Sequence, residues 1–302
     1  MTLTELRYMV RLAELKHFGA AAAACHVSQP TLSVAIKKLE DFLGTTLFER
    51  RKHQVLLTES GERLLPQARR ILQETDLMIH MAHDEDERYQ QSIRLGAILT
   101  VGPYIFPHLI QRISTQQLRL NLFLTEDFTN NLLIALEQGS LDAIILATPV
   151  DERLYRVYPL YSEPLELLLP AQHPWAQLEQ IDLNMLDSSQ LLMLAEGHCL
   201  RDQVLTACPN LQTERNTSMR GNSLATLSHM IALGMGMTLI PSSAEKVLCQ
   251  AHEGMLVCRS IRPMISREIH LVSRRSDQRH RIHEQLQNQL KACRTPYMAI
   301  HS

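Results

Sequence analysis

The sequence predicts an N-terminal all-α domain of the winged helix-turn-helix class and a C-terminal α/β domain with two lobes. Apolar residues recur at helical spacing through the first 60 positions, and strand-like runs alternate with helical segments after residue 91. One long periodic segment separates these two patterns. We therefore expect a winged helix-turn-helix domain over residues 1–58, a linker and dimerisation helix over 59–90, and a larger domain over 91–302.

The composition is that of an ordinary globular protein. Hydrophobic residues make up 45% of the 302 positions, charged residues make up 21%, and the formal net charge is −2. No stretch approaches the roughly 18 apolar residues of a membrane span, and the charged N-terminus lacks the pattern of a secretory signal. We therefore expect a cytoplasmic protein. Six cysteines without a C-x-x-C pair predict no disulfide scaffold and no metal site, and no motif predicts a cofactor.

Residues 18–44 carry a helix-turn-helix pattern. The alanine-rich run Phe18–Cys25 predicts a short helix, and a second helix begins after Ser28, a residue type that favours the N-cap position. Pro30 fits because it falls in the first helical turn, and Gly44 predicts the end of the helix. A short apolar helix, a turn and a helix with polar residues at its start are typical of DNA-binding domains.

A basic tip, Arg50–Lys52, follows the second helix. Strand-like runs at Thr46–Glu49 and Val55–Leu57 flank it and predict a winged hairpin. DNA binding needs hydrogen-bond donors at a helix start and cations for the phosphates. Residues 1–60 carry eight Lys or Arg and six Asp or Glu, so tight binding needs a dimer or a larger assembly. A helical interaction domain with a solvated basic loop is the alternative. The candidate DNA contacts are Ser28, Gln29, Pro30, Thr31, Ser33, Lys37, Lys38, Arg50, Arg51 and Lys52.

The larger domain divides into two predicted lobes. The alternation of strands and helices favours largely parallel sheets, and the length suits lobe I at about 91–162 and 268–302 and lobe II at about 163–267. The predicted helices include Tyr104–Ile113, Asn131–Glu137, Leu224–Leu233 and Arg279–Ala292. The predicted strands are Ile93–Leu99, Leu120–Thr125, Ala143–Ala147, Leu165–Pro170, Leu191–Leu194, Met237–Ile240 and Glu268–Val272.

Two cysteines in "EGHCLRDQVLTACPN" form a candidate redox pair. Cys199 begins a predicted helix beside His198 and Arg201, where the helix dipole and nearby cations favour the thiolate. Nine helical steps separate the Cα atoms of Cys199 and Cys208 by roughly 13.5 Å. A disulfide needs roughly 4.4–6.8 Å, so a continuous helix and a bond exclude each other, and oxidation has to refold the segment.

Spacing alone does not select this pair. Cys249 and Cys258 are also nine residues apart, and free cysteine is among the residue types most often buried for packing. From the residues alone, a reactive pair and two packing thiols both stay open.

The N-terminal motifs "VSQPTLS", "KLEDFLGTTLFER" and "LTESG" resemble the signature of LysR-type transcriptional regulators. The resemblance implies a winged helix-turn-helix that binds promoter DNA, a linker helix that mediates dimers, and a two-lobed regulatory domain like that of periplasmic binding proteins. There are departures from the family pattern. Ala20 and Ala21 stand where many members carry a basic residue, and Lys37 stands where arginine is common, which replaces a bidentate guanine contact with a single-point one.

The run "GHCLRDQ", followed by a cysteine at this spacing, resembles the peroxide-sensing OxyR branch of the family, as do "TVGPYIFPHLI" and "HPWA". The resemblance implies that hydrogen peroxide oxidises Cys199 and that Cys208 resolves the product into a disulfide. It also implies a homodimer or homotetramer, RNA polymerase as a partner and a glutaredoxin- or thioredoxin-type reductant. The implied peroxide pocket consists of Thr100, Thr129, His198, Asp202 and Arg267.

Two other classes of function are a regulator that binds a small effector and an enzyme. A LysR-type regulator commonly binds a small effector in the cleft between its lobes, where helix N-termini favour anions. An enzyme, such as a thiol peroxidase or cysteine hydrolase, is disfavoured because adjacent His198 and Cys199 have poor geometry for a catalytic dyad. We therefore expect no enzymatic activity and no contact with membranes.

Overall fold

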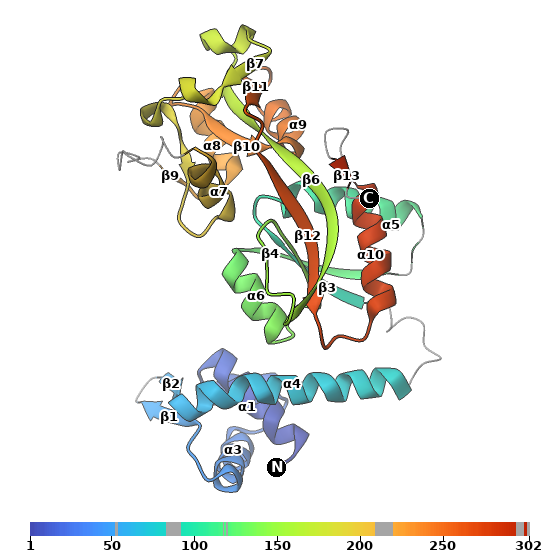
Figure 1. Cartoon of the computed structure of the whole chain (residues 1–302). Helices are drawn as coiled ribbons and strands as arrows, with labels where there is room; N and C mark the ends of the chain where they lie inside the picture. Colours follow the sequence, from blue (N-terminus) through green and yellow to red (C-terminus); the bar gives the residue numbers. More distant parts are fainter. Residues whose placement is uncertain are drawn as a thin grey trace. The chain divides into compact units, whose positions relative to one another are not determined.

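The computed structural model describes residues 1–51, 54–82, 92–116, 118, 120–208, 220–293 and 299–300. The chain forms two compact units, Met1–Gln90 and Gln91–Ser302, and each is described by itself (Figure 1). Among the described residues, no helix is both long enough and apolar enough to cross a bilayer.

The first unit is helical with one hairpin. The predicted caps are present: the Ser28 hydroxyl accepts a hydrogen bond from the Thr31 amide, and Gly44 ends the helix with a φ of 66°. Apolar residues on the inner helix faces, including Leu12, Leu32 and Ile36, form one core. The elements are α1 (Leu3–Leu15), α2 (Phe18–Ala24), α3 (Gln29–Leu43), β1 (Phe48–Arg51), β2 (Gln54–Leu57) and α4 (Glu59–Ala82).

The second unit is built on one mixed sheet. Its strand order is β4-β3-β5-β12-β6-β11-β7, and β10 and β13 also pair with β6. The strands are β3 (Ser92–Ile98), β4 (Asn121–Asp127), β5 (Ala143–Leu146), β6 (Tyr155–Pro170), β7 (Gln180–Asp182), β8 (Met193–Leu194), β9 (Arg220–Gly221), β10 (Thr238–Pro241), β11 (Leu256–Arg262), β12 (Ser266–Arg274) and β13 (Ala299–Ile300). The helices are α5 (Gly102–Thr115), α6 (Thr129–Glu137), α7 (Cys199–Ala207), α8 (Leu224–Ala232), α9 (Ser242–Gln250) and α10 (His280–Ala292), with 3₁₀ turns at Pro174–Gln177, Leu183–Met185 and Ser188–Gln190.

The expectation of largely parallel sheets was wrong. β3 pairs in parallel with β4 and β5, and β11 with β7, but β12 runs antiparallel to both β5 and β6, and β10 and β11 run antiparallel to β6. The run of apolar residues that marks a strand carries no information about its direction. In Figure 1, β6 and β12 lie side by side along the length of the unit.

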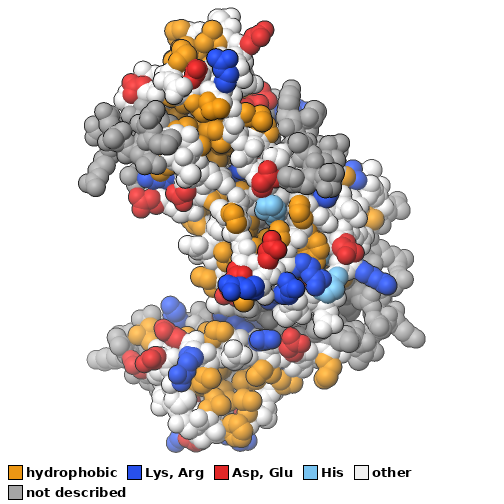
Figure 2. Space-filling model, in the orientation of Figure 1, with side chains coloured by type: hydrophobic (Ala, Val, Ile, Leu, Met, Phe, Trp, Pro, Cys, Tyr) orange, Lys and Arg blue, Asp and Glu red, His pale blue; other side chains and the backbone are white. Residues whose placement is uncertain are grey.

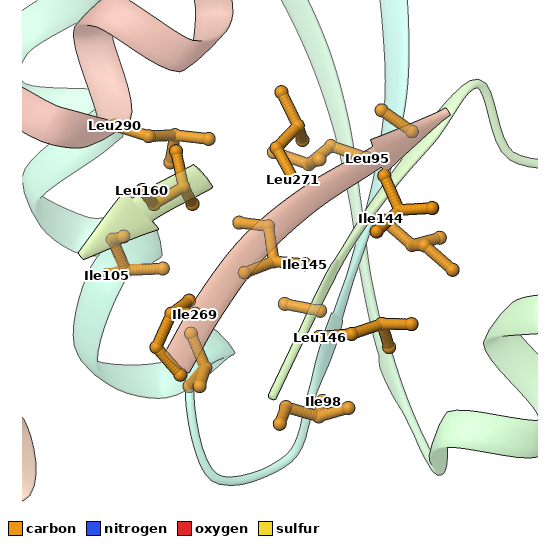
Figure 3. Close-up of a cluster of buried hydrophobic side chains, with 14 of the residues drawn as sticks. Leu95, Ile98, Ile105, Ile144, Ile145, Leu146, Leu160, Ile269, Leu271 and Leu290 are labelled. Carbon is orange, nitrogen blue, oxygen red and sulfur yellow. The ribbon is translucent and has the colours of Figure 1, made fainter. Parts of the chain in front are cut away.

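Strand β6 begins at Tyr155, ten residues before the predicted start at Leu165. The prediction was too short because Pro159 and Pro164 interrupt the strand signal in the sequence before Leu165. Strand β6 supplies side chains to two separate cores. Figure 3 shows the first, which includes Leu160 of β6 together with Ile105, Ile145 and Ile269. The second core holds Leu165, Leu167, Leu168 and Leu169 of β6.

Helix α7 contacts both cores. Cys199, its first residue, belongs to the first core, whereas Leu200, Val204 and Cys208 belong to the second. The two thiols of the candidate pair are therefore anchored in different parts of the regulatory unit, and any movement of one toward the other has to take apolar side chains out of a core.

A Gly61→Ala substitution tests the packing of α4 on the hairpin. An added Cβ would lie 2.2 Å from the Leu47 carbonyl oxygen. Helix propensity alone favours alanine by about 1 kcal/mol, but the steric overlap outweighs it, so we expect a net loss of roughly 1–3 kcal/mol in the free energy of unfolding. Urea unfolding measures this loss, with the exposed Glu62→Ala as the control. A more stable Gly61→Ala variant would contradict the close approach.

Candidate functional site

Helix α3 presents an exposed polar face at its N-terminal end. Leu32, Ile36 and Leu39 are buried on its inner face, which turns Thr31 and Lys37 toward solvent. The predicted contacts Ser28, Gln29, Pro30, Thr31, Lys37 and Lys38 are all exposed, and Ser33 is half-buried. A helix with this face is suited to enter the major groove of DNA.

The predicted wing is the hairpin of β1 and β2. Arg50 pairs with Val55 and Arg51 with Gln54, and Lys52 lies outside the described residues. On the face of the molecule shown in Figure 2, side chains of both charges lie interspersed among apolar and neutral ones. Attraction to phosphates therefore has to come from local groups of cations such as the wing, not from the net charge of −2.

The second candidate site begins where the chain enters α7. Gly197 has a φ of 96°, and a Cβ there would lie 3.2 Å from the Phe128 ring, so both the backbone and the space favour glycine. The next residue, His198, is the N-cap and packs edge-on against Phe128, with ring centroids 4.8 Å apart. Cys199 follows as the first helical residue, as predicted.

A buried ion pair lies beside this segment. The Arg267 guanidinium lies 2.8 Å from the Glu163 carboxylate, and the side chains are only 1% and 0% exposed. Arg267 also donates to the hydroxyl and the carbonyl of Thr100, both at 2.9 Å, while Glu163 accepts from the Ser243 amide at 3.1 Å. These bonds join β12, β6, the turn after β3 and the start of α9.

Burial dominates the electrostatics of Cys199. It raises the pKa of this thiol, while the charge of Arg267, the nearby Thr129 hydroxyl and the Leu200 amide lower it, and Asp202 raises it. The net direction is upward, so the expectation of a lowered pKa was wrong. That expectation weighed dipole and charge without the loss of solvent around a residue that is 8% exposed.

Polar atoms with unused hydrogen-bonding capacity lie around Cys199. The Thr129 hydroxyl lowers the pKa of the thiol as its hydrogen-bond partner and contacts no other polar atom among the described residues, and His198 Nε2 is buried there without a partner. Burial lowers the pKa of His198, against a smaller effect of the Asn222 backbone. Donors and acceptors in this arrangement suit a small polar molecule.

The structure thus brings most of the predicted pocket together. Thr100 is tied to Arg267, and the effects of Arg267 and Thr129 on the thiol place both near Cys199. Asp202 is exposed on the first turn of α7 and acts on the sulfur through its charge.

Cys208 lies at the other end of α7. It is the C-cap residue, it is buried, and burial raises the pKa of its thiol. Because α7 is continuous, its rise per residue separates the Cα atoms of Cys199 and Cys208 by roughly 13.5 Å. Both thiols are free.

Sequence reasoning missed Glu163 and Phe128. Glu163 leaves a weak signal, because it lies in the largely apolar run "YSEPLELLLP" and a buried carboxylate needs a cation. No local signal identifies Phe128 as the residue that holds His198.

An Arg267→Met substitution tests the role of the guanidinium. We expect a higher Cys199 pKa, seen as slower alkylation of this thiol at neutral pH, and a loss of about 3–5 kcal/mol of stability because Glu163 is left as an unpaired buried charge. Adding Glu163→Gln should recover part of that stability. The control is Arg201→Met, because Arg201 has no resolved effect on the pKa of Cys199. Equal alkylation rates in the wild type and Arg267→Met would contradict this role.

Comparison with known proteins gives a consistent result. Residues 3–62 match the family described as bacterial regulatory helix-turn-helix protein, lysR family, and residues 86–293 match the LysR substrate binding domain. The chain is 39% identical to the DNA-binding transcriptional dual regulator OxyR of Escherichia coli strain K12, over 97% of this chain and 95% of that protein. It is also 39% identical to the hydrogen peroxide-inducible genes activator of Dickeya chrysanthemi, over 100% and 97%.

Two solved structures are also similar. A full-length cysteine-to-aspartate variant of OxyR from Pseudomonas aeruginosa has a TM-score of 0.82 and 40% identity, covering 100% of this chain and 99% of that one. A hydrogen peroxide-bound cysteine-to-serine variant of Corynebacterium glutamicum OxyR has a TM-score of 0.65 and 32% identity, covering 97% and 92%. This chain therefore belongs to the LysR family of bacterial helix-turn-helix regulators, within its OxyR branch.

Proposed function

We propose that this chain is a DNA-binding transcriptional regulator that senses hydrogen peroxide through a reversible disulfide between Cys199 and Cys208. The observation that carries this proposal is that α7 holds the two thiols at its opposite ends and in different cores. Their bond and the helix exclude each other. The names of the relatives, which include hydrogen peroxide-inducible genes activators, support peroxide as the signal.

The first step is oxidation of Cys199. Its thiolate attacks one peroxide oxygen, the O–O bond breaks, and the second oxygen leaves as hydroxide and becomes water on protonation. The sulfur loses two electrons and becomes a sulfenic acid. Arg267 stabilises the thiolate electrostatically. The Thr129 hydroxyl beside the sulfur and the unpartnered His198 Nε2 supply hydrogen bonds to the bound peroxide, with Thr100 and Asp202 as the remaining proposed pocket residues.

The second step forms the disulfide. The Cys208 thiolate attacks the sulfenic sulfur, and hydroxide leaves as water. Closing a ten-residue ring contributes about 2.7 kcal/mol in the loop-entropy estimate. Against it stand the helical hydrogen bonds of α7 and the burial of Leu200 and Val204. This gain and this loss are of similar size, so the reduced and oxidised folds are close in free energy and the change is reversible.

The readout is a change in DNA binding. We propose that refolding of residues 199–208 alters how the regulatory domains (residues 91–302) pair within a homodimer or homotetramer. Their linker helices (59–90) then reposition the winged heads (1–58) on promoter DNA, where RNA polymerase is recruited. A glutaredoxin- or thioredoxin-type dithiol in the cytoplasm reduces the bond again. The exposed groups of α3, together with Arg50, Arg51 and Lys52 of the wing, are the proposed DNA contacts.

Thiol mapping by mass spectrometry tests the switch. We expect low-dose peroxide to produce a Cys199–Cys208 disulfide and faster amide exchange across α7. Cys199→Ser should abolish the response while the protein still binds promoter DNA, and Cys208→Ser should stop at a sulfenic acid that dimedone traps. Cys293→Ser, a buried thiol outside the site, is the control and should respond normally.

A regulator that answers to a small effector would give no selective 199–208 bond. A normal peroxide response in Cys199→Ser would refute the mechanism outright.

A further inference from the structure

A second pair of thiols lies away from α7. Cys249, near the end of α9, and Cys258, in β11, have their sulfur atoms 3.7 Å apart. Cys258 is buried and Cys249 is half-buried, and both are free. The proposed peroxide switch uses neither of them.

Two carboxylates converge on Cys258. Glu166 of β6, Glu245 of α9 and Cys258 each offer a ligand atom, and these three atoms all lie within 4.8 Å of one another. Glu245 and Cys249 are one helical turn apart and so share a face of α9. This helix packs on β6 and β11, where Glu166 stands opposite Ser260, two residues from Cys258.

The cluster carries acidic groups without a cation. Among the described residues, no Lys, Arg or His forms an ion pair with Glu166 or Glu245, and Glu166 Oε2 is buried with no hydrogen-bond partner. Burial and the charge of Glu245 raise the pKa of Glu166 to about 7. The two sulfurs share a hydrogen bond that lowers the pKa of Cys249 and raises that of Cys258, so one thiol ionises more readily than the other.

We propose that Cys249, Cys258, Glu166 and Glu245 form a binding site for Zn²⁺. Tetrahedral zinc with Zn–S bonds of about 2.3 Å places two thiolate sulfurs roughly 3.7–3.8 Å apart, which is the separation already present here. Thiolate sulfur selects zinc over magnesium or calcium, and carboxylate oxygens complete the four ligands.

Binding requires both thiols to lose their protons to solvent. The dication offsets two of the four negative charges of this ligand set, for which no ion pair with a cationic side chain is present among the described residues.

The sequence expectation of no metal site rested on the absence of C-x-x-C. The four ligands come from three segments, and only the packing of α9 on the sheet brings them together. The site also ties α9 to β11 and β6, so a bound ion should raise the stability of the regulatory unit through ligand linkage.

Zinc titration of the full-length, chemically reduced protein tests the proposal. We expect one zinc ion per chain after dialysis, and Co²⁺ as a probe should give a near-ultraviolet thiolate-to-metal charge-transfer band. Cys249→Ser and Cys258→Ser should each weaken binding more than about tenfold and remove or halve that band, and Glu166→Gln should weaken binding without removing it. Cys293→Ser is the matched control and should bind normally.

The Cys199→Ser variant separates this site from the peroxide switch, since it should keep full zinc binding. Circular dichroism and promoter binding show whether each variant is folded. Zinc binding that survives in a folded Cys249→Ser, Cys258→Ser double variant would overturn the proposal. So would a reduced wild type that binds no zinc, or one in which the two thiols form only a disulfide.

Discussion

The ion pair between Arg267 and Glu163 is the interaction on which the regulatory unit depends. Both charges are removed from water, a cost that their mutual attraction offsets only because further hydrogen bonds to Thr100 and Ser243 use the remaining donors and acceptors. Those bonds connect the turn after β3, strands β6 and β12, and the start of α9. The same guanidinium partly offsets the effect of burial on the Cys199 thiol. The Arg267 guanidinium therefore contributes both to the packing of the regulatory unit and to the pKa of Cys199. A substitution of Arg267 or of Glu163 alone should change both properties.

The structure reconciles a buried thiol with peroxide chemistry. A fully exposed Cys199 would ionise more easily but would have no fixed neighbours, whereas the buried thiol has Arg267 for its charge and Thr129 within reach of its sulfur. Under the proposed function, a small neutral oxidant bound there would meet the unused hydrogen-bonding capacity of His198 Nε2. Because Cys208 lies in the other core, the proposed oxidation of Cys199 would require a movement of apolar side chains.

The features that could be predicted from the sequence are those set by a few neighbouring residues. The N-cap at Ser28, the helix end at Gly44 and the start of α7 at Cys199 each follow from a few neighbouring residues, and the structure has all three. Strand direction, the length of β6 and the pairing of Arg267 with Glu163 depend on residues far apart in the chain, so no short window contains them. The pKa of Cys199 was misjudged for the same reason, because its burial is produced by packing from distant elements.

The two cysteine pairs have the same spacing in the sequence, but the path of the chain between the cysteines gives them different sulfur separations. Each pair is nine residues apart, but Cys199 and Cys208 lie at the two ends of one helix, whereas the chain between Cys249 and Cys258 leaves α9, turns and returns as β11. The first arrangement holds the thiols roughly 13.5 Å apart by helical rise, and the second brings the sulfurs to 3.7 Å. A separated pair can bond only by refolding, which suits a switch. A disulfide between two sulfurs that are already in contact would cause no large change in structure. The same closeness preorganises the two thiols as metal ligands.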